Sequence, residues 1–95
     1  MRVAVMSDIH GFSIAFETVL ADLERQGPFD EVIVAGDLCE VGPAPAEVLD
    51  LLNERDFTVL QGNTDFDLVE AAKFSPNHSD HYSIKQIGQE GVDYL

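Results

Sequence analysis

The chain has 95 residues, 45% of them hydrophobic, and its 18 acidic against 5 basic side chains give a formal net charge of −13. This length allows at most one compact domain, and neither a linker nor an internal repeat is evident. An acidic surface of this strength repels phosphate backbones and anionic lipids, so we exclude general nucleic-acid and membrane-surface binding. The acidity serves either simple solubility or the binding of cations.

The cysteine content and the short apolar N-terminus indicate a protein without disulfides or a membrane anchor. Cys39 is the only cysteine, so the chain cannot form an internal disulfide, and nothing suggests an oxidising compartment. The apolar stretch from Val3 to Met6 is far too short for a signal peptide or a membrane span. We therefore expect a cytoplasmic protein in which Cys39 is a small loop residue.

The first third of the chain predicts a strand followed by a helix. Residues 2–6 predict a short strand whose hydrophobicity is continuous, as in a parallel strand covered on both faces. Ser13 is the expected N-cap of the next helix, and Gly27-Pro28 is expected to end it. The expected buried face of this helix is formed by Phe12, Phe16, Val19, Leu20 and Leu23.

The alternation of strand and helix continues through the middle of the chain. Residues 31–35 predict a second strand, residues 46–53 a second helix and residues 57–60 a third strand. This order predicts an α/β fold, a β-α-β-α-β unit of parallel strands with right-handed crossovers and flanking helices. The inward positions of the second helix are expected to be Val48, Leu49 and Leu52.

The last third of the chain predicts two further helices around a loop. Helical character returns over residues 65–73, and the polar, proline-containing segment 74–82 predicts a loop. Ser83 and Gln86 have the spacing of a capping box, which predicts the start of a final helix.

Each predicted strand ends in a short polar sequence: SDIHG, GDLCE and GNTD. In a parallel sheet the carboxyl ends of the strands meet at one edge, where open α/β sheets bind ligands. Asp8 and His10 lie two residues apart on a segment that we expect to be extended, so their side chains can turn toward one point. Asp37, Asn63 and Asp65 are expected beside them.

The residue types at this edge favour a metal site. Converging carboxylates repel one another unless a cation lies between them. Oxygen and nitrogen donors without thiolate suit Mn, Fe, Zn, Ni or Mg ions, and two ions about 3.5–4 Å apart can clamp a phosphoryl group. Taken by itself, each short motif is more often explained by turn chemistry. Three of them at successive strand ends favour the metal interpretation.

The same three motifs resemble those of the calcineurin-like metallophosphoesterase family, in particular its small bacterial and archaeal branch. That family carries D-x-H, G-D and G-N-H-D/E in this order, followed by a single histidine and G-H-x-H. This chain has DIH at residues 8–10, GD at residues 36–37 and GNTD at residues 62–65. The resemblance is strongest over residues 1–75.

The resemblance implies an activity and a role for several residues. Asp8, His10 and Asp37 would hold a first divalent ion, Asp37 would bridge to a second ion, and Asn63 would bind that second ion. A hydroxide bridging the ions would attack phosphorus in line. The implied function is therefore hydrolysis of a phosphomonoester or phosphodiester, with two divalent ions (Mn, Fe, Zn, Ni or Mg) as cofactors and a phosphate ester as substrate.

Two departures from the family pattern affect these expectations. Thr64 stands where many relatives have a histidine that assists the leaving group, so good leaving groups should be favoured. Asp65 is the remaining candidate for a catalytic side chain, either orienting a ligand or water or acting as a weak acid.

The second departure is that the later histidine motifs have no counterpart up to Leu95. Residues 1–95 are therefore expected to be the N-terminal portion of a single metallophosphoesterase domain whose C-terminal half is absent. His78 and His81 lie in the predicted loop and are expected to be exposed or to face the substrate rather than a metal. We expect such a half to associate with a complementary C-terminal fragment or with a second copy.

Other functional classes fit the sequence less well. A phosphoacceptor signalling domain needs an acidic pair after its first strand and a lysine near a later strand, whereas Lys73 and Lys85 follow no predicted strand. An aspartate-nucleophile phosphatase would carry D-x-D where this chain has D-x-H. The alternative that stays open is a truncated, non-catalytic metal-binding or subunit-interaction module, which would lack phosphatase activity.

Overall fold

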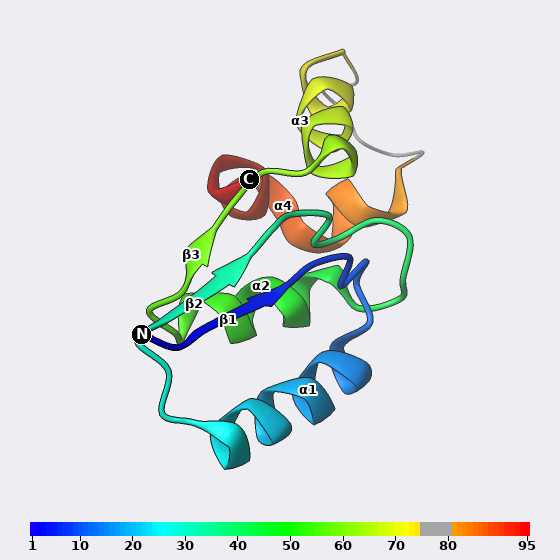
Figure 1. Cartoon of the computed structure of the whole chain (residues 1–95). Helices are drawn as coiled ribbons and strands as arrows, with labels where there is room; N and C mark the ends of the chain where they lie inside the picture. The colour runs from blue at the N-terminus through cyan, green and yellow to red at the C-terminus, as the bar shows by residue number, and fades with distance from the viewer. Residues whose placement is uncertain (75–80) are drawn as a thin grey trace.

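The computed structural model describes residues 1–74 and 81–95, which form an α/β fold (Figure 1). The strands form a parallel three-stranded sheet in the order β1-β2-β3. The predicted β-α-β-α-β unit is therefore confirmed, with its crossover helices in place. The elements of this unit are β1 (Val3–Met6), α1 (Ser13–Gln26), β2 (Glu31–Val34), α2 (Pro45–Asn53) and β3 (Thr58–Val59).

Two more helices lie beyond the carboxyl ends of the strands, as Figure 1 shows. Helix α3 (Asn63–Phe74) follows β3, and helix α4 (Tyr82–Tyr94) packs against both α2 and α3. No helix among the described residues is long and apolar enough to cross a membrane. Because α3 begins at Asn63, its N-terminus lies at the edge of the sheet where the polar motifs are expected.

Both predicted N-caps are wrong. The N-cap of α1 is Phe12, since the preceding turn enters the helix one residue sooner than predicted, and Ser13 is already helical. Ser83 is the second residue of α4 and is only 3% exposed, so its side chain packs inside the molecule and does not cap the helix. The N-cap of α4 is His81 instead, and neither helix has a capping hydrogen bond from the side chain of its N-cap residue.

The hydrophobic core lies between the sheet and its helices. Val34 of β2 is completely buried, and Met6 and Val59 of the neighbouring strands pack beside the core cluster. The three inward positions predicted for α2 are confirmed as buried. The other buried members of this cluster are Phe16, Leu20, Leu38, Cys39, Val48, Leu49, Leu52, Leu68 and Ile84.

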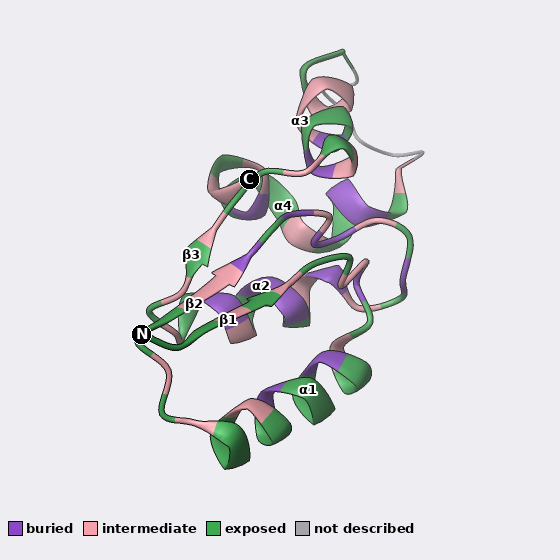
Figure 2. Ribbon diagram, in the orientation of Figure 1, coloured by how far each residue is buried: buried purple, intermediate pink, exposed green. Residues whose placement is uncertain are grey.

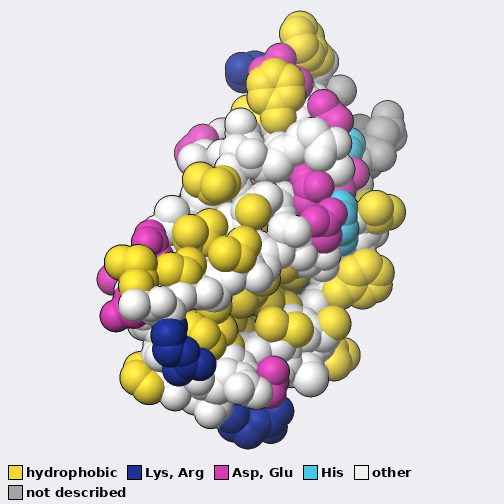
Figure 3. Space-filling model, in the orientation of Figure 1, with side chains coloured by type: hydrophobic (Ala, Val, Ile, Leu, Met, Phe, Trp, Pro, Cys, Tyr) yellow, Lys and Arg dark blue, Asp and Glu magenta, His cyan; other side chains and the backbone are white. Residues whose placement is uncertain are grey.

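The expectation that β1 is covered on both faces is wrong. Burial alternates along the strand, with Val3 and Val5 41% and 67% exposed, and Leu60 beyond β3 is 52% exposed (Figure 2). Hydrophobic side chains accordingly gather across the middle of the surface in Figure 3. The predicted face of α1 is also too wide, because Phe12 and Val19 are about half exposed. The helices cover one face of the sheet within the described residues.

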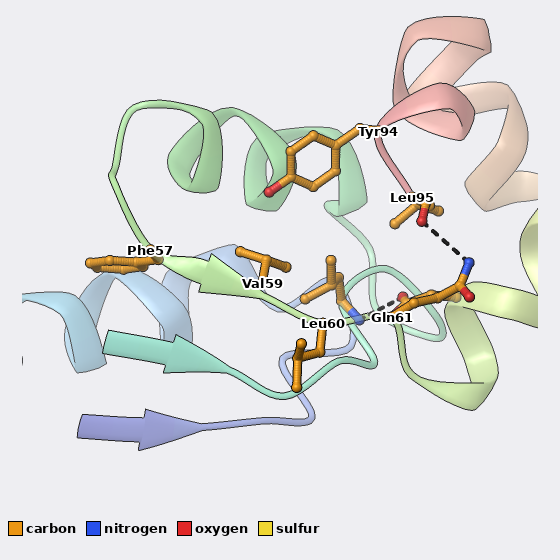
Figure 4. A pocket seen from close by; sticks show the side chains of 8 residues that line it. Phe57, Val59, Leu60, Gln61, Tyr94 and Leu95 are labelled. Atoms are coloured by element: carbon orange, nitrogen blue, oxygen red, sulfur yellow. Dashed lines mark hydrogen bonds between the residues drawn. The ribbon is translucent and has the colours of Figure 1, made fainter. Parts of the chain in front are cut away.

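A cavity of about 270 Å³ lies between β3 and the end of α4 (Figure 4). Its walls are mainly apolar side chains, with Phe57 and Val59 on the strand side and Tyr94 on the helix side. The Gln61 Nε2 atom donates a hydrogen bond of 3.2 Å to the Leu95 carbonyl at its rim. The buried Asp65 also lines this cavity, whereas Asp8 does not.

Burial on α1 predicts a difference in stability between two similar substitutions. Leu20 is 4% exposed and Ile14 on the same helix is 80% exposed. We expect Leu20→Ala to lower the free energy of unfolding by about 2–4 kcal/mol, because it removes packed methyl groups and leaves a cavity. Ile14→Ala should change it by less than about 0.5 kcal/mol. Urea denaturation measures both values, and equal losses would contradict the burial described for α1.

Candidate metal centre

Asp8, His10 and Asp37 lie together at the carboxyl edge of the sheet. One potential ligand atom from each residue lies within 4.8 Å of the other two. Asp8 and His10 follow β1, and Asp37 follows β2. Figure 3 shows acidic and histidine side chains grouped at one edge of the visible surface. The structure thus brings together three of the residues that the sequence predicted as ligands.

The backbone at these three residues is left-handed rather than extended, which corrects the expected geometry. The φ angles of Asp8, His10 and Asp37 are 61°, 52° and 57°. Positive φ is uncommon outside glycine, and such residues cost about 1–3 kcal/mol each unless their surroundings stabilise them. The side chains therefore converge because each loop turns sharply after its strand, not because alternate residues share a strand face.

Backbone hydrogen bonds join the loops that follow β1 and β2. The Asp8 amide donates to the Gly36 carbonyl at 3.1 Å, and the His10 amide donates to the Asp37 carbonyl at 2.9 Å. The Gly11 amide continues this ladder by donating to the Leu38 carbonyl at 2.8 Å. Because the two loops pair in this way, the left-handed residues are fixed relative to one another.

The His10 imidazole is oriented through both of its nitrogens. Nδ1 contacts the Glu40 carbonyl, and Nε2 lies 3.1 Å from Asp8 Oδ1. The Glu40 carbonyl is the main cause of a raised pKa of His10; the Asp8 and Asp37 carboxylates add to it, and burial opposes it. The pKa of Asp8 is lowered, first by the Ser7 hydroxyl and then by His10. With Nδ1 bound to the carbonyl, Nε2 is the nitrogen that points toward Asp8.

The Asp37 carboxylate lies at the N-terminus of α3, where free backbone amides favour negative charge. Asp37 Oδ1 accepts hydrogen bonds from the Thr64 amide at 3.0 Å and from the Thr64 hydroxyl at 2.8 Å. The Asn63 side chain lies beside it, with its amide nitrogen 3.2 and 3.3 Å from the two carboxylate oxygens when the NH₂ group faces Asp37. A Cβ on Gly62 would lie 2.3 Å from Asp37 Oδ1, so this approach requires glycine.

Thr64 holds Asp37 in a way that the sequence motifs do not predict. By its place in the family pattern Thr64 only replaces a histidine that assists the leaving group, whereas in the structure its hydroxyl orients Asp37. The sequence signal for this role is the position of Thr64 directly after Asn63. A residue in the first turn of a helix can present both a free backbone amide and its side chain to an anion such as a carboxylate.

Asp65 is completely buried behind the centre and not beside Asp8 and His10. Its Oδ2 accepts hydrogen bonds of 2.8 Å from the Asp37 and Gly62 amides, and its Oδ1 accepts one of 2.8 Å from the Leu38 amide. The carboxylate therefore joins the loop after β2 to the loop after β3. This position suits the alignment of Asp37 and leaves the Asp65 carboxylate without exposed surface.

The donor set suits a divalent ion, and the spacing of one pair of its ligand atoms fits such an ion. Adjacent ligand atoms that are each about 2.1 Å from a first-row ion lie about 3.0–3.4 Å apart. The 3.1 Å between Asp8 Oδ1 and His10 Nε2 falls in this range. No arginine or lysine in residues 1–74 and 81–95 forms an ion pair with Asp8 or Asp37, so a cation would compensate their charge. For a second ion, the described residues offer Asp37 and Asn63.

The remaining histidines and the cysteine lie outside this group. Cys39 is completely buried in the core cluster, and burial raises the pKa of its thiol to about 12, which keeps the thiol neutral there. His81 is the N-cap of α4, and its Nε2 lies 3.8 Å from a Glu40 carboxylate oxygen. His78 lies outside the described residues.

Comparisons with known proteins agree with this geometry. The model of the calcineurin-like phosphoesterase family matches residues 1–95. A metallophosphoesterase from Sphaerobacter thermophilus is 27% identical with a TM-score of 0.76, and the match covers 99% of this chain and 40% of that chain. A protein provisionally assigned as a diadenosine tetraphosphatase is 26% identical with a TM-score of 0.70, covering 98% of this chain and 40% of that chain.

A third structure, a hypothetical protein from Pyrococcus horikoshii OT3, shares the fold. It is 22% identical with a TM-score of 0.72, and the match covers 98% of this chain and 46% of that chain. No curated protein matches the chain. The chain thus spans less than half the length of the solved structures that it matches.

The buried carboxylate of Asp65 predicts a large effect of a nearly isosteric change. In Asp65→Asn, an NH₂ group would face backbone amides that now donate to a carboxylate oxygen. We expect the free energy of unfolding to fall by about 2–4 kcal/mol, since hydrogen bonds to charged groups are lost and donors are left buried. Asp67→Asn, on an exposed residue of the same helix, is the control and should cost less than about 0.5 kcal/mol. Similar urea midpoints for the two variants would contradict the role of Asp65.

Proposed function

We propose that this chain, which belongs to the calcineurin-like phosphoesterase family, forms the metal-binding part of a phosphoesterase that hydrolyses phosphomonoesters or phosphodiesters. Family membership supports phosphoester hydrolysis in general. The observation that carries the proposal is the convergence of Asp8, His10 and Asp37 at one edge of the sheet. The similarity to a protein provisionally assigned as a diadenosine tetraphosphatase adds nucleotide polyphosphates to the substrates worth testing.

The residues of the chain would bind and orient the cofactors of this reaction. In the proposed arrangement Asp8, His10 and Asp37 hold a first divalent ion, and Asp37 and Asn63 contribute to a second. When bound, such ions activate water and stabilise negative charge on the phosphoryl group. Thr64 keeps Asp37 Oδ1 in place through its amide and hydroxyl, and Asp65 aligns the loop that carries Asp37. We propose Asp65 as a positioning residue rather than as a proton donor.

The hydrogen bonding of Thr64 determines whether it could donate a proton to the leaving group. Its hydroxyl donates to Asp37, and an alcohol is a poor proton donor near neutral pH, so it gives little help to a departing alkoxide. Because the other described residues of the centre are proposed metal ligands, none of them is free to act as a general acid.

A non-catalytic metal-binding or subunit-interaction module is the second candidate. Two observations favour it: the described residues supply only Asp37 and Asn63 to a second ion, and Val5 and Leu60 on the sheet are exposed. In this case the chain would bind one ion weakly and associate with a complementary fragment or a second copy. Metal binding without phosphatase activity would separate this candidate from the enzyme.

Substitution of the proposed bridging ligand tests the metal assignment. We expect Asp37→Asn to lower both bound metal per chain and phosphatase activity, the latter by at least about 100-fold, because charge stabilisation by metal supplies several kcal/mol in such reactions. The fold should persist, since asparagine keeps an oxygen that accepts the Thr64 hydrogen bonds. Elemental analysis and rates with an aryl phosphate provide the two readouts.

The matched control for this substitution is Glu17→Gln, which removes one exposed negative charge on α1. It should leave metal content and activity unchanged. Unaltered metal content together with full activity in Asp37→Asn would rule out Asp37 as a bridging ligand.

Leaving-group dependence tests the absence of a general acid. We expect kcat/KM for aryl phosphates to exceed that for alkyl phosphates by at least about 100-fold, the smallest contribution usual for a positioned acid. A series of substituted phenyl phosphates should show rates that rise as the pKa of the leaving phenol falls. Equal rates on aryl and alkyl esters would mean that another group donates the proton.

A further inference from the structure

The start of α4 makes two contacts with the loop between β2 and α2. The Tyr82 hydroxyl donates a hydrogen bond of 2.5 Å to the Pro43 carbonyl. His81 Nε2 lies 3.8 Å from Glu40 Oε1, close enough for an ion pair when the imidazole is protonated. The N-cap and the first residue of α4 therefore contact the two ends of the short segment 40–43.

This segment in turn contacts His10. The Glu40 carbonyl is the partner of His10 Nδ1, and the Gly42 amide donates to the His10 carbonyl at 2.5 Å. The Ala44 amide then donates to the Gly11 carbonyl at 2.9 Å. The position of the segment thus determines how the imidazole of His10 is oriented.

The first turn of helix α4, next to these contacts, is packed in the interior. Ser83 and Ile84 in its first turn are 3% and 1% exposed, and Ile84 belongs to the core cluster. Because these two residues are packed in the interior, the backbone next to His81 and Tyr82 is joined directly to the core. A contact made by a helical turn that is packed in this way restrains the loop that it contacts.

We propose that His81 and Tyr82 are positioning residues that hold the Glu40 carbonyl against His10 Nδ1 and so turn His10 Nε2 toward Asp8, where a metal ion would bind. The proposal rests on the function proposed above and assigns part of the metal centre to a helix that supplies no ligand. A histidine ligand commonly donates its second N–H to a carbonyl, which sets the tautomer and the ring orientation. Here the carbonyl itself needs support, because Glu40 lies in a loop between β2 and α2.

The tautomer of His10 tests this proposal without any metal. In the metal-free full chain, long-range ¹H–¹⁵N correlation spectra recorded where the imidazole is neutral distinguish Nδ1–H from Nε2–H. We expect the wild-type chain to show the Nδ1–H form at His10. The Tyr82→Phe variant and the Tyr82→Phe/His81→Gln double variant should show a growing fraction of Nε2–H.

The matched control is Tyr94→Phe, which removes a hydroxyl from the same helix at a residue outside the loop contacts. It should leave the His10 tautomer as in the wild-type chain. Tyr82 is 54% exposed, so Tyr82→Phe removes little packing and should unfold at nearly the wild-type urea concentration.

Metal affinity provides an independent readout. We expect Tyr82→Phe to weaken Co²⁺ binding about tenfold, the low end of the range for partners of metal ligands, because it acts through Glu40. The visible absorption of bound Co²⁺ should also shift, whereas Tyr94→Phe should change neither value. If the wild-type chain binds no Co²⁺, the proposed function fails, and the tautomer measurement alone still decides the role of the two residues. An unchanged His10 tautomer in the double variant would overturn the proposal.

Discussion

The arrangement of the metal centre depends on the buried carboxylate of Asp65. Burying an unpaired charge is costly, and here three backbone amides offset that cost, two from the loop after β2 and one from the loop after β3. The strands in this region are only four and two residues long, so the sheet alone offers few hydrogen bonds to hold their ends together. Asp65 provides the missing connection, and it also fixes the amide of Asp37, the proposed bridging ligand.

The other features of the centre follow from this alignment. Once the loops after β2 and β3 are joined, Asp37 meets the N-terminus of α3, where Thr64 binds one of its oxygens. The loop after β1 pairs with the loop after β2, which brings Asp8 and His10 to the same edge. The strained left-handed residues are thus held by backbone hydrogen bonds, and the side chains are oriented before any ion arrives. Such preorganisation favours binding because less freedom is lost when the ion binds.

Much of the fold and part of the site could be predicted from the sequence, for identifiable reasons. Alternating apolar runs and helical patterns determine the parallel order of the strands, and parallel order alone brings Asp8 and Asp37 to one edge. The left-handed conformation of His10 could not be predicted, because it depends on hydrogen bonds between loop residues that are 27 or 28 positions apart in the chain. The roles of Asp65 and Thr64 depend on the same tertiary contacts. The exposure of Val5 could not be predicted either, since a continuous apolar run does not reveal which layers cover it.

Anomalous diffraction from crystals of the chain grown with Mn²⁺ tests the central claim most directly. The account predicts an anomalous peak at the carboxyl edge of the sheet, about 2.0–2.3 Å from His10 Nε2 and from carboxylate oxygens of Asp8 and Asp37. Thr64 should still donate to Asp37 in that structure, and Asp65 should remain bound to its three amides. An ion bound elsewhere, with Asp8, His10 and Asp37 all uncoordinated at saturating Mn²⁺, would contradict the account.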